Sequence, residues 1–192
     1  MKISGLILAG GLGRRMGSVD KGLVLFNDRP MIASVIERLV PQVDELLINA
    51  NRNGEIYERF GYRVVRDSID GFAGPLAGIE SGLANATHDL LLTCPCDSPF
   101  LPLNLGARLC SALETQALDL AAAKTGNQAH PVFCIMRKSV HQHLRDFLAA
   151  GGRKIDVWYS TLKMAEVNFD DVADAFANIN TEGELKNFER KP

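Results

Sequence analysis

The chain has 192 residues with a formal net charge of −2, of which 46% are hydrophobic and 23% charged. This composition is typical of a single globular domain, and the nearly balanced charge argues against a nucleic-acid polymer as partner, since such partners select basic surfaces. No apolar run approaches the ~20 residues of a membrane-spanning helix and the N-terminus lacks a signal-peptide pattern, so we expect a cytoplasmic protein with no membrane contact.

The first hundred residues alternate between short apolar runs and amphipathic segments. The apolar runs predict strands over 3–8, 46–48, 62–66 and 90–92. Helical spacing and Pro or Gly boundaries predict helices between them, over 31–39, 55–60 and 75–86. Because the strands are continuously apolar, they indicate a parallel sheet covered on both faces. We therefore predict an α/β fold, a three-layer sandwich around a mostly parallel, Rossmann-like central sheet.

The second half of the chain is less regular. Helices are predicted over 103–116 and 139–150, and a further short helical stretch is expected to begin at Arg153 and Lys154. Strands are predicted over 118–123, 132–136 and 163–167. A Thr-x-x-Glu capping box at 181–184 predicts a terminal helix. With no repeat or linker separating the halves, residues 1–192 are predicted to form one domain.

Polar or small residues follow the predicted strands of the first half. The strand ends carry the glycine-rich loop 8–21, Asn49, Asp67 and Asp97. Ligands of open parallel sheets bind outside the carboxyl ends of the strands, which lie along one edge. We therefore expect these residues to form one ligand site.

The loop over 8–21 has the features of a phosphate-binding segment. Its glycines expose backbone N–H groups, and it also contains three cations, Arg14, Arg15 and Lys21. It is not a P-loop, because Lys21 is followed by Gly22 and by no Ser or Thr that would hold magnesium. A dinucleotide fingerprint is disfavoured, because Met16 stands at the third glycine position.

The cysteines and the remaining polar residues suggest no second site. Cys94, Cys96, Cys110 and Cys134 lack partners at zinc-site spacing and are predicted to be buried reduced thiols. The histidines His88, His141 and His143 are expected to be surface residues without partners. The remaining acids are expected to be solvated; they include Glu37, Glu45, Asp170 and Asp171.

The pattern L-A-G-G-x-x-x-R-M-G-x-x-D-K over 8–21 resembles the signature of nucleotidyltransferases that activate phosphorylated substrates. Within that group the chain most resembles the molybdenum cofactor guanylyltransferases. Similar segments follow in the family's order at 49–52, 67–68, 74–78, 95–99, 130–131, 153 and 178–181. Ser18 departs from the family, which often has a second glycine there.

This resemblance covers nearly the whole chain, and it implies both a fold and a reaction. The fold would be that of the nucleotide-diphospho-sugar transferases. The reaction would transfer GMP from GTP to the terminal phosphate of molybdopterin, in its molybdenum-bound form, and release pyrophosphate. Residues 1–100 would form the GTP-binding half and residues 101–192 the half that meets the pterin and partner proteins.

The resemblance also implies roles for individual residues. Catalysis would depend on Arg15, Lys21 and Asp97, with Asp97 holding Mg²⁺ because a hard cation prefers carboxylate oxygen. GTP would be bound by Leu8, Ala9, Gly10, Gly11, Lys21, Asn49, Asp67 and Asp97. The pterin substrate would be bound by Gly74, Gly78, His130, Arg153, Lys154, Asn178 and Asn180. The role of Arg14 is left open.

Several alternatives remain at the level of the sequence. Gly11 favours guanine, because relatives that use cytidine tend to have alanine at that position. A molybdopterin cytidylyltransferase or a sugar-phosphate nucleotidyltransferase is the alternative enzyme. A GTP-binding carrier or sensor without turnover is the non-enzymatic alternative. The family further implies contact with molybdenum cofactor biosynthesis proteins and with molybdoenzyme chaperones or apoenzymes.

Overall fold

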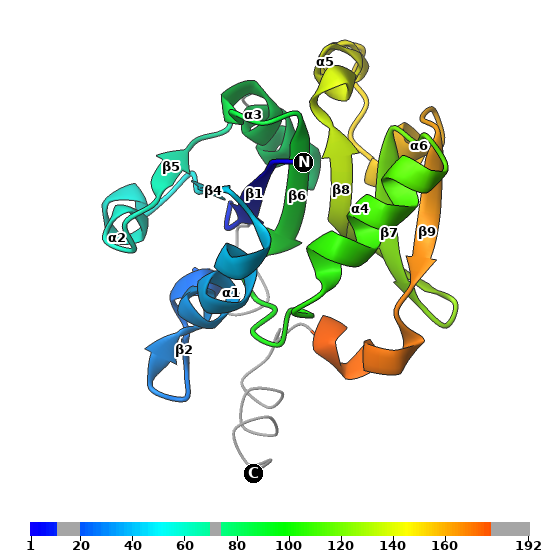
Figure 1. The fold of residues 1–192 in the computed structure, drawn as a ribbon. Coiled ribbons are helices and arrows are strands. Elements are labelled where there is room, and N and C mark those ends of the chain that lie inside the picture. The colour runs from blue at the N-terminus through cyan, green and yellow to red at the C-terminus, as the bar shows by residue number, and fades with distance from the viewer. Residues whose placement is uncertain (11–19, 70–73, 178–192) are drawn as a thin grey trace.

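The computed structural model describes residues 1–10, 20–69 and 74–177. Its centre is a seven-stranded sheet with the order β5-β4-β1-β6-β8-β7-β9 (Figure 1). Strand β8 is antiparallel to its neighbours β6 and β7, and the other neighbouring strands are parallel. The strands are β1 (Ile3–Leu8), β4 (Glu45–Asn49), β5 (Arg63–Val65), β6 (Leu90–Pro95), β7 (Leu120–Thr125), β8 (Gln128–Arg137) and β9 (Met164–Asn168). The predicted mostly parallel sheet is confirmed.

Helices cover both faces of this sheet. One face carries α1 (Met31–Leu39) and α4 (Leu105–Thr115), and the other carries α3 (Pro75–Asn85), α5 (His141–Ala149) and α6 (Ile155–Tyr159). The central strand β1 supplies both interfaces, because Ile7 belongs to the first core and Leu6 to the second. Burial on both faces explains the continuously apolar strands. The predicted three-layer sandwich is therefore confirmed.

Shorter elements connect the layers. Helix α2 (Gly54–Glu58) follows β4, and a small hairpin of β2 (Leu25–Phe26) and β3 (Arg29–Pro30) precedes α1. The 3-10 helices within the described residues are η2 (Lys21–Leu23), η3 (Val40–Gln42), η4 (Lys138–Val140) and η5 (Asp170–Phe176). Within the described part of the chain, no helix is both long and apolar enough to cross a membrane.

Two strands of the second half begin at least two residues away from their predicted start. Strand β7 begins at Leu120 because Leu118, although buried, still bonds through its N–H to Leu113 O at the end of α4. Strand β8 begins at Gln128 because it forms a tight hairpin with β7 around Gly126, whose φ is 52°. The hairpin residues are polar and exposed, so they carry no apolar signal. The predicted terminal helix lies outside the described residues.

Strand β8 contains an irregularity beside the carboxyl edge of the sheet. Ala122 pairs with Cys134, but the next residue of β7 pairs with His130. The hydroxyl of Thr93 donates to Val132 O at 2.6 Å, and the hydroxyl of Tyr159 donates to Pro131 O at 2.7 Å. These bonds hold the extra residues of β8 in place, and they fix where His130 lies.

Candidate active site

The ends of β1, β4 and β6 meet at the carboxyl edge of the sheet. Leu8 pairs with Asn49 on one side and with Pro95 on the other. Beyond this register, Ala9 N donates to Asn49 O at 2.8 Å and Cys96 N donates to Leu8 O at 3.1 Å. The segments after the three strands therefore lie side by side, as the sequence predicts.

A lysine and a carboxylate face each other at this edge. Lys21 Nζ lies 3.0 Å from Asp97 Oδ2, and their side chains are 24% and 11% exposed. Asp97 is held in the turn after β6, and Lys21 begins η2. Both side chains are mostly buried but still reach solvent. An anionic ligand could therefore contact Lys21, and a cation that accompanies the ligand could contact Asp97.

Asn49 and Asp67 are joined although they follow different strands. Asn49 Nδ2 donates to Asp67 Oδ1 at 2.8 Å, and Asn51 Nδ2 donates to Asp67 Oδ2 at 2.7 Å. Asp67 N in turn donates to Asn51 Oδ1 at 2.9 Å. Asn49 is 2% exposed. The three side chains form a rigid polar cluster at the ends of β4 and β5.

Two glycines border the side chain of Asn49. A Cβ on Gly78 would lie 2.4 Å from Asn49 Oδ1 and 2.6 Å from Leu8 Cδ2, and a Cβ on Gly10 would lie 3.1 Å from Asn49 Oδ1. Gly78 therefore lets α3 pack directly on the asparagine. Gly74, just before α3, has φ 62° and ψ −149°, a conformation that favours glycine.

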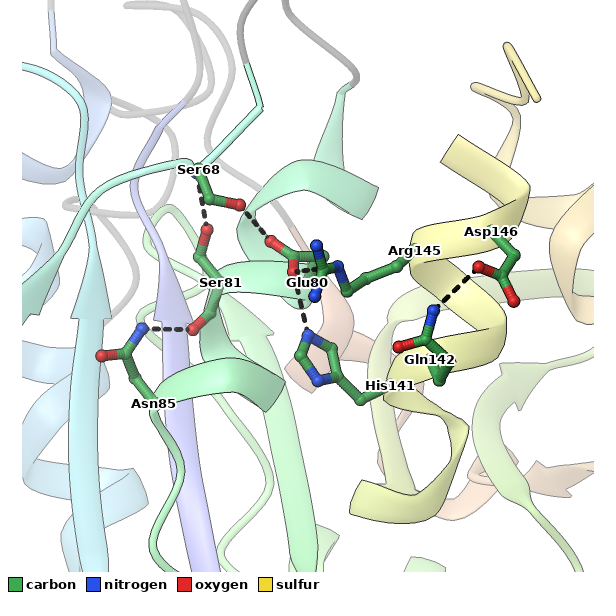
Figure 2. A network of polar contacts seen from close by, with 8 residues as sticks. All are labelled: Ser68, Glu80, Ser81, Asn85, His141, Gln142, Arg145 and Asp146. Atoms are coloured by element: carbon green, nitrogen blue, oxygen red, sulfur yellow. Dashed lines mark hydrogen bonds and ion pairs between the residues drawn. The ribbon is translucent and has the colours of Figure 1, made fainter. Parts of the chain in front are cut away.

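The residue after Asp67 is anchored to α3. Ser81 Oγ accepts from Ser68 N at 3.0 Å, and the Ser68 hydroxyl donates to Glu80 Oε2 (Figure 2). Glu80 is only 5% exposed in its side chain, and its other oxygen lies 2.9 Å from His141 Nε2 and 4.0 Å from Arg145 Nε. Glu80 thus links the turn after β5 to α5 in the second half of the chain.

The residues expected to meet the pterin have partners in the second half. His130 Nε2 lies 2.7 Å from Thr125 Oγ1, and its ring stacks on Phe176 with centroids 4.6 Å apart. Burial lowers the pKa of His130, which favours the neutral form of its imidazole. Arg153 Nη1 donates to Leu148 O at 2.9 Å at the end of α5. Lys154 is exposed at the N-cap of α6.

Some predicted site residues cannot be placed. Gly11, Arg14, Arg15, Asn178 and Asn180 lie outside the described residues. Of the described ones, Leu8, Ala9, Gly10, Lys21, Asn49, Asp67, Gly78 and Asp97 belong to the carboxyl edge of the first half. His130, Arg153 and Lys154 belong to the second half.

Two histidines that were expected to have no partner have one. His141 binds Glu80, and His143 Nδ1 accepts from Trp158 Nε1 at 3.0 Å. Glu45, expected to be solvated, is partly buried and accepts from Thr87 N, whereas Asp170 and Asp171 are exposed as expected, although they bond to Gly126 N and Arg108. The expectations for His141, His143 and Glu45 were wrong because each partner lies at least 15 positions away in sequence, so no local pattern indicates it.

Three of the four cysteines have the buried surroundings that the sequence predicts. Cys94, Cys96 and Cys134 are buried free thiols, whereas Cys110 is only partly buried. Burial raises the pKa of the Cys94 and Cys96 thiols, and the nearby Asp97 carboxylate raises both further. Cys96, which lies in the same turn as Asp97, therefore packs as a neutral thiol against the segment that carries Lys21.

Comparison with known proteins gives consistent matches over the chain. The model of the MobA-like NTP transferase domain matches residues 5–163. A molybdenum cofactor guanylyltransferase of Cupriavidus necator is 50% identical, with 98% of this chain and 97% of that protein covered. One of Shewanella putrefaciens is 48% identical, with 98% and 96% covered.

The fold has solved counterparts. The structure of molybdopterin-guanine dinucleotide biosynthesis protein A from Archaeoglobus fulgidus superposes with a TM-score of 0.81 at 24% identity, covering 98% of this chain and 97% of that one. The neighbours include further nucleotidyltransferases, so the predicted nucleotide-diphospho-sugar transferase-like fold is confirmed.

Proposed function

This chain belongs to the MobA-like NTP transferase family, and we propose that it is a molybdenum cofactor guanylyltransferase. It transfers GMP from GTP to the terminal phosphate of molybdopterin and releases pyrophosphate. The extent of the relatives' similarity supports this activity, since close to half of all residues are identical over nearly the full length of both chains.

The observation that carries the proposal is the Lys21–Asp97 pair beside the end of β1. Its Nζ–Oδ2 distance is 3.0 Å, and Cys96, next to Asp97, bonds through its N–H to Leu8 O at the end of β1, close to Gly10, where a nucleotide could approach the backbone. The Asn49–Asp67 cluster lies on the opposite side of Gly10. Triphosphate chemistry and nucleoside recognition can thus be served by neighbouring groups at one edge of the sheet.

The proposed reaction is an in-line displacement at the α-phosphorus. An oxygen of the molybdopterin phosphate forms a bond to the α-phosphorus of GTP, the bond between the α-phosphorus and the bridging oxygen breaks, and pyrophosphate carries away the electron pair. Such a step needs alignment and charge neutralisation more than a covalent nucleophile. Lys21 neutralises charge on the triphosphate and on the leaving pyrophosphate. Arg15 shares this role in the proposal.

Residues at the other end of the nucleotide select the base and sugar in this proposal. The Asn49–Asp67 cluster supplies fixed hydrogen-bonding groups, because the two side chains bond to each other and Asp67 is also held by Asn51. Gly10 and Gly11 bring backbone N–H groups to the nucleotide without side chains in the way.

The carboxylate of Asp97 fits magnesium. Mg²⁺ in nucleotide enzymes is commonly held by one or two carboxylates together with substrate phosphates, so a single aspartate beside the triphosphate suffices. Among the described residues no larger group of metal-binding side chains is present, which matches this mode of binding. Magnesium, when bound, would offset charge on the α-phosphate and on the leaving group. Asp97 would hold it while Lys21 moves to the triphosphate.

The second half of the chain completes the proposal. His130, Arg153 and Lys154 would meet the pterin and its phosphate, with Asn178 and Asn180 from the terminal segment and Gly74 and Gly78 from the start of α3. We place the reaction in the cytoplasm, with other cofactor-biosynthesis proteins supplying molybdopterin and molybdoenzyme chaperones or apoenzymes receiving the product.

The test is pyrophosphate release by the purified protein with magnesium and molybdenum-loaded molybdopterin. We expect release with GTP and a product whose mass equals molybdopterin plus GMP. CTP in place of GTP separates the cytidylyltransferase alternative, and a sugar 1-phosphate in place of molybdopterin separates the sugar-phosphate alternative. GTP binding without release under all conditions would instead identify a carrier or sensor.

A further inference from the structure

Asp20, the residue before Lys21, is hydrogen-bonded to helix α2 and to the residue that precedes this helix. We propose that Asp20 and Tyr57 are positioning residues for Lys21, with Tyr57 holding the Asp20 carboxylate so that the lysine is presented to the nucleotide. The proposal rests on the proposed function, in which Lys21 neutralises the triphosphate. It assigns roles to two residues that do not themselves face the ligand.

Two donors hold the Asp20 carboxylate. The hydroxyl of Tyr57 donates to Oδ1, and Asn53 Nδ2 donates to Oδ2 at 3.0 Å. Tyr57 is fully buried, and burial raises the pKa of its hydroxyl, which therefore keeps its proton and acts as a donor. Asn53 has a left-handed backbone (φ 53°, ψ 28°) and directly precedes α2. Both oxygens of Asp20 are thus bound to one short element.

The anchored aspartate fixes the backbone that carries the lysine. Asp20 O accepts from Leu23 N at 3.0 Å, and Lys21 O accepts from Val24 N at 3.2 Å, which forms the single turn η2. Val24 O then accepts from Met31 N at 2.8 Å at the start of α1. A shift of Asp20 would therefore shift the turn on which Lys21 stands.

Gly22 shows how closely this turn packs against the tyrosine. A Cβ at Gly22 would lie 2.7 Å from the Tyr57 oxygen and 3.2 Å from Cys96 Cβ. Cys96 precedes Asp97, so the turn that begins with Lys21 packs at Gly22 against both the hydroxyl of Tyr57 and the end of β6. The contacts of Gly22 with Tyr57 and Cys96 thus fix the position of Lys21 relative to Asp97.

A core tyrosine without such a role would affect stability alone, so the test must separate positioning from folding. We measure pyrophosphate release and the GTP dissociation constant for Tyr57→Phe in the wild-type background and in the Lys21→Met background. Tyr57→Phe removes only the hydroxyl. Tyr62→Phe, at a partly buried tyrosine outside this contact, is the matched control. Asn53→Gly removes the second donor and keeps the left-handed backbone accessible.

We expect Tyr57→Phe to lower kcat/KM for GTP by about 10-fold to 100-fold, because small displacements of a charge-neutralising group are costly in phosphoryl transfer. Asn53→Gly should lower it less, and Tyr62→Phe should leave it unchanged. In the Lys21→Met background, Tyr57→Phe should change neither the residual rate nor the GTP dissociation constant by more than about 2-fold, because the group it positions is gone.

The result that would overturn the proposal is an equal fold-loss in both backgrounds, or wild-type kcat/KM in Tyr57→Phe. The GTP titration gives a value for every variant, including any that turns over too slowly to follow. Failure of the proposed function would look different, since the wild-type protein itself would then release no pyrophosphate from GTP.

A second pair of variants tests the contact at Gly22. Gly22→Ala alone should reduce activity because the new methyl group pushes the Tyr57 hydroxyl away from Asp20. In the Tyr57→Phe background that oxygen is absent, so Gly22→Ala should cause a markedly smaller further loss. Fully additive losses would contradict the positioning role.

Discussion

The side-chain amide of Asn49 donates to Asp67 Oδ1 at 2.8 Å and to Val65 O at 3.3 Å. With both acceptors on the Nδ2 side, Oδ1 must point the other way, toward Gly10 and Gly78. One buried amide therefore connects β4, the turn after β5 and the start of α3. Its orientation is fixed before any ligand arrives, which reduces the ordering that nucleotide binding requires.

Gly78→Ala tests this arrangement. The new Cβ would lie 2.4 Å from Asn49 Oδ1, so the amide must move. We expect a loss of about 1–3 kcal/mol in unfolding free energy from overpacking, together with at least about 10-fold weaker GTP binding, because a displaced site amide costs about the free energy of a buried hydrogen bond. Urea denaturation and GTP titration measure the two effects.

Gly82→Ala is the matched control for that experiment. It lies one turn further along α3, and its Cβ would lie 2.4 Å from Leu6 Cδ2 in the core rather than near Asn49. It should therefore destabilise the protein to a similar extent and leave GTP affinity intact. Equal weakening of GTP binding by both variants would show that general strain in α3, and not the amide, is responsible.

Asp97→Asn tests the carboxylate at the end of β6. The amide preserves the shape of the side chain but removes the negative charge that pairs with Lys21 and suits magnesium. We expect pyrophosphate release to fall by about 100-fold to 1,000-fold, the usual cost of losing one group that stabilises transition-state charge. GTP affinity without magnesium should persist, since Lys21 is retained.

Magnesium titration sharpens the test of Asp97. The wild-type rate should disappear with a chelator and return with added magnesium, whereas the variant should need a much higher concentration. Asp174→Asn, at an exposed acid in η5, should titrate like the wild type. An unchanged magnesium requirement in Asp97→Asn would remove this residue from metal binding.

Glu80→Ala tests the polar link between α3 and α5 (Figure 2). The substitution removes a buried carboxylate and leaves the hydroxyl of the exposed Ser68 and the partly exposed His141 without their acceptor. Because water can reach both groups, we expect a loss of about 0.5–1.5 kcal/mol, the net contribution of a typical hydrogen bond, seen as a lower urea midpoint. Glu80→Gln should lose less, because its amide oxygen still accepts one of the two bonds.

Gln142→Ala provides the comparison for Glu80. Gln142 bonds only to the exposed Asp146 within α5, so its removal should change stability by less than about 0.5 kcal/mol. Similar effects of Gln142→Ala and Glu80→Ala would mean that the buried link contributes nothing beyond an ordinary surface contact.

The fold and half of the candidate site could be predicted because their signals are local. Apolar runs gave the strands, and strand ends gave Asn49, Asp67 and Asp97, since parallel topology brings such ends together whatever the loops do. The pairing of Glu80 with His141 could not be predicted, because the two residues are 61 positions apart and no local pattern links them.

The Asp20–Tyr57 contact shows the same limit at the site itself. Asp20 belongs to a recognisable loop pattern, but its partner lies in a helix of five residues, too short to give a strong periodic signal. Similarly, the polar start of β8 carries no apolar pattern, so the strand containing His130 was predicted too short. Long-range hydrogen bonds depend on how distant segments pack together, and the sequence of a single segment does not specify that packing.

His130 predicts a pH dependence of stability. Burial lowers its pKa below the ordinary value of 6.5, so between those two values the unfolded chain binds a proton that the folded chain does not. The contribution of His130 to the unfolding free energy is then fully present above about pH 6.5. It decreases as the pH falls toward the folded-state pKa, because protonation favours the unfolded chain. Replacing His130 with glutamine removes this contribution and keeps a polar side chain facing Thr125.

The measurement is the unfolding free energy of wild type and His130→Gln from about pH 8 to about pH 5, an interval that spans the ordinary histidine pKa. The other titrating groups are common to both proteins, so the difference between the two curves reports His130 alone. We expect the wild type to lose its advantage over the variant, or to fall further below it, as the pH decreases. A constant difference would show that His130 titrates alike in both states, and a difference that grows in favour of the wild type would show that folding stabilises the charged imidazole against the stacked ring of Phe176.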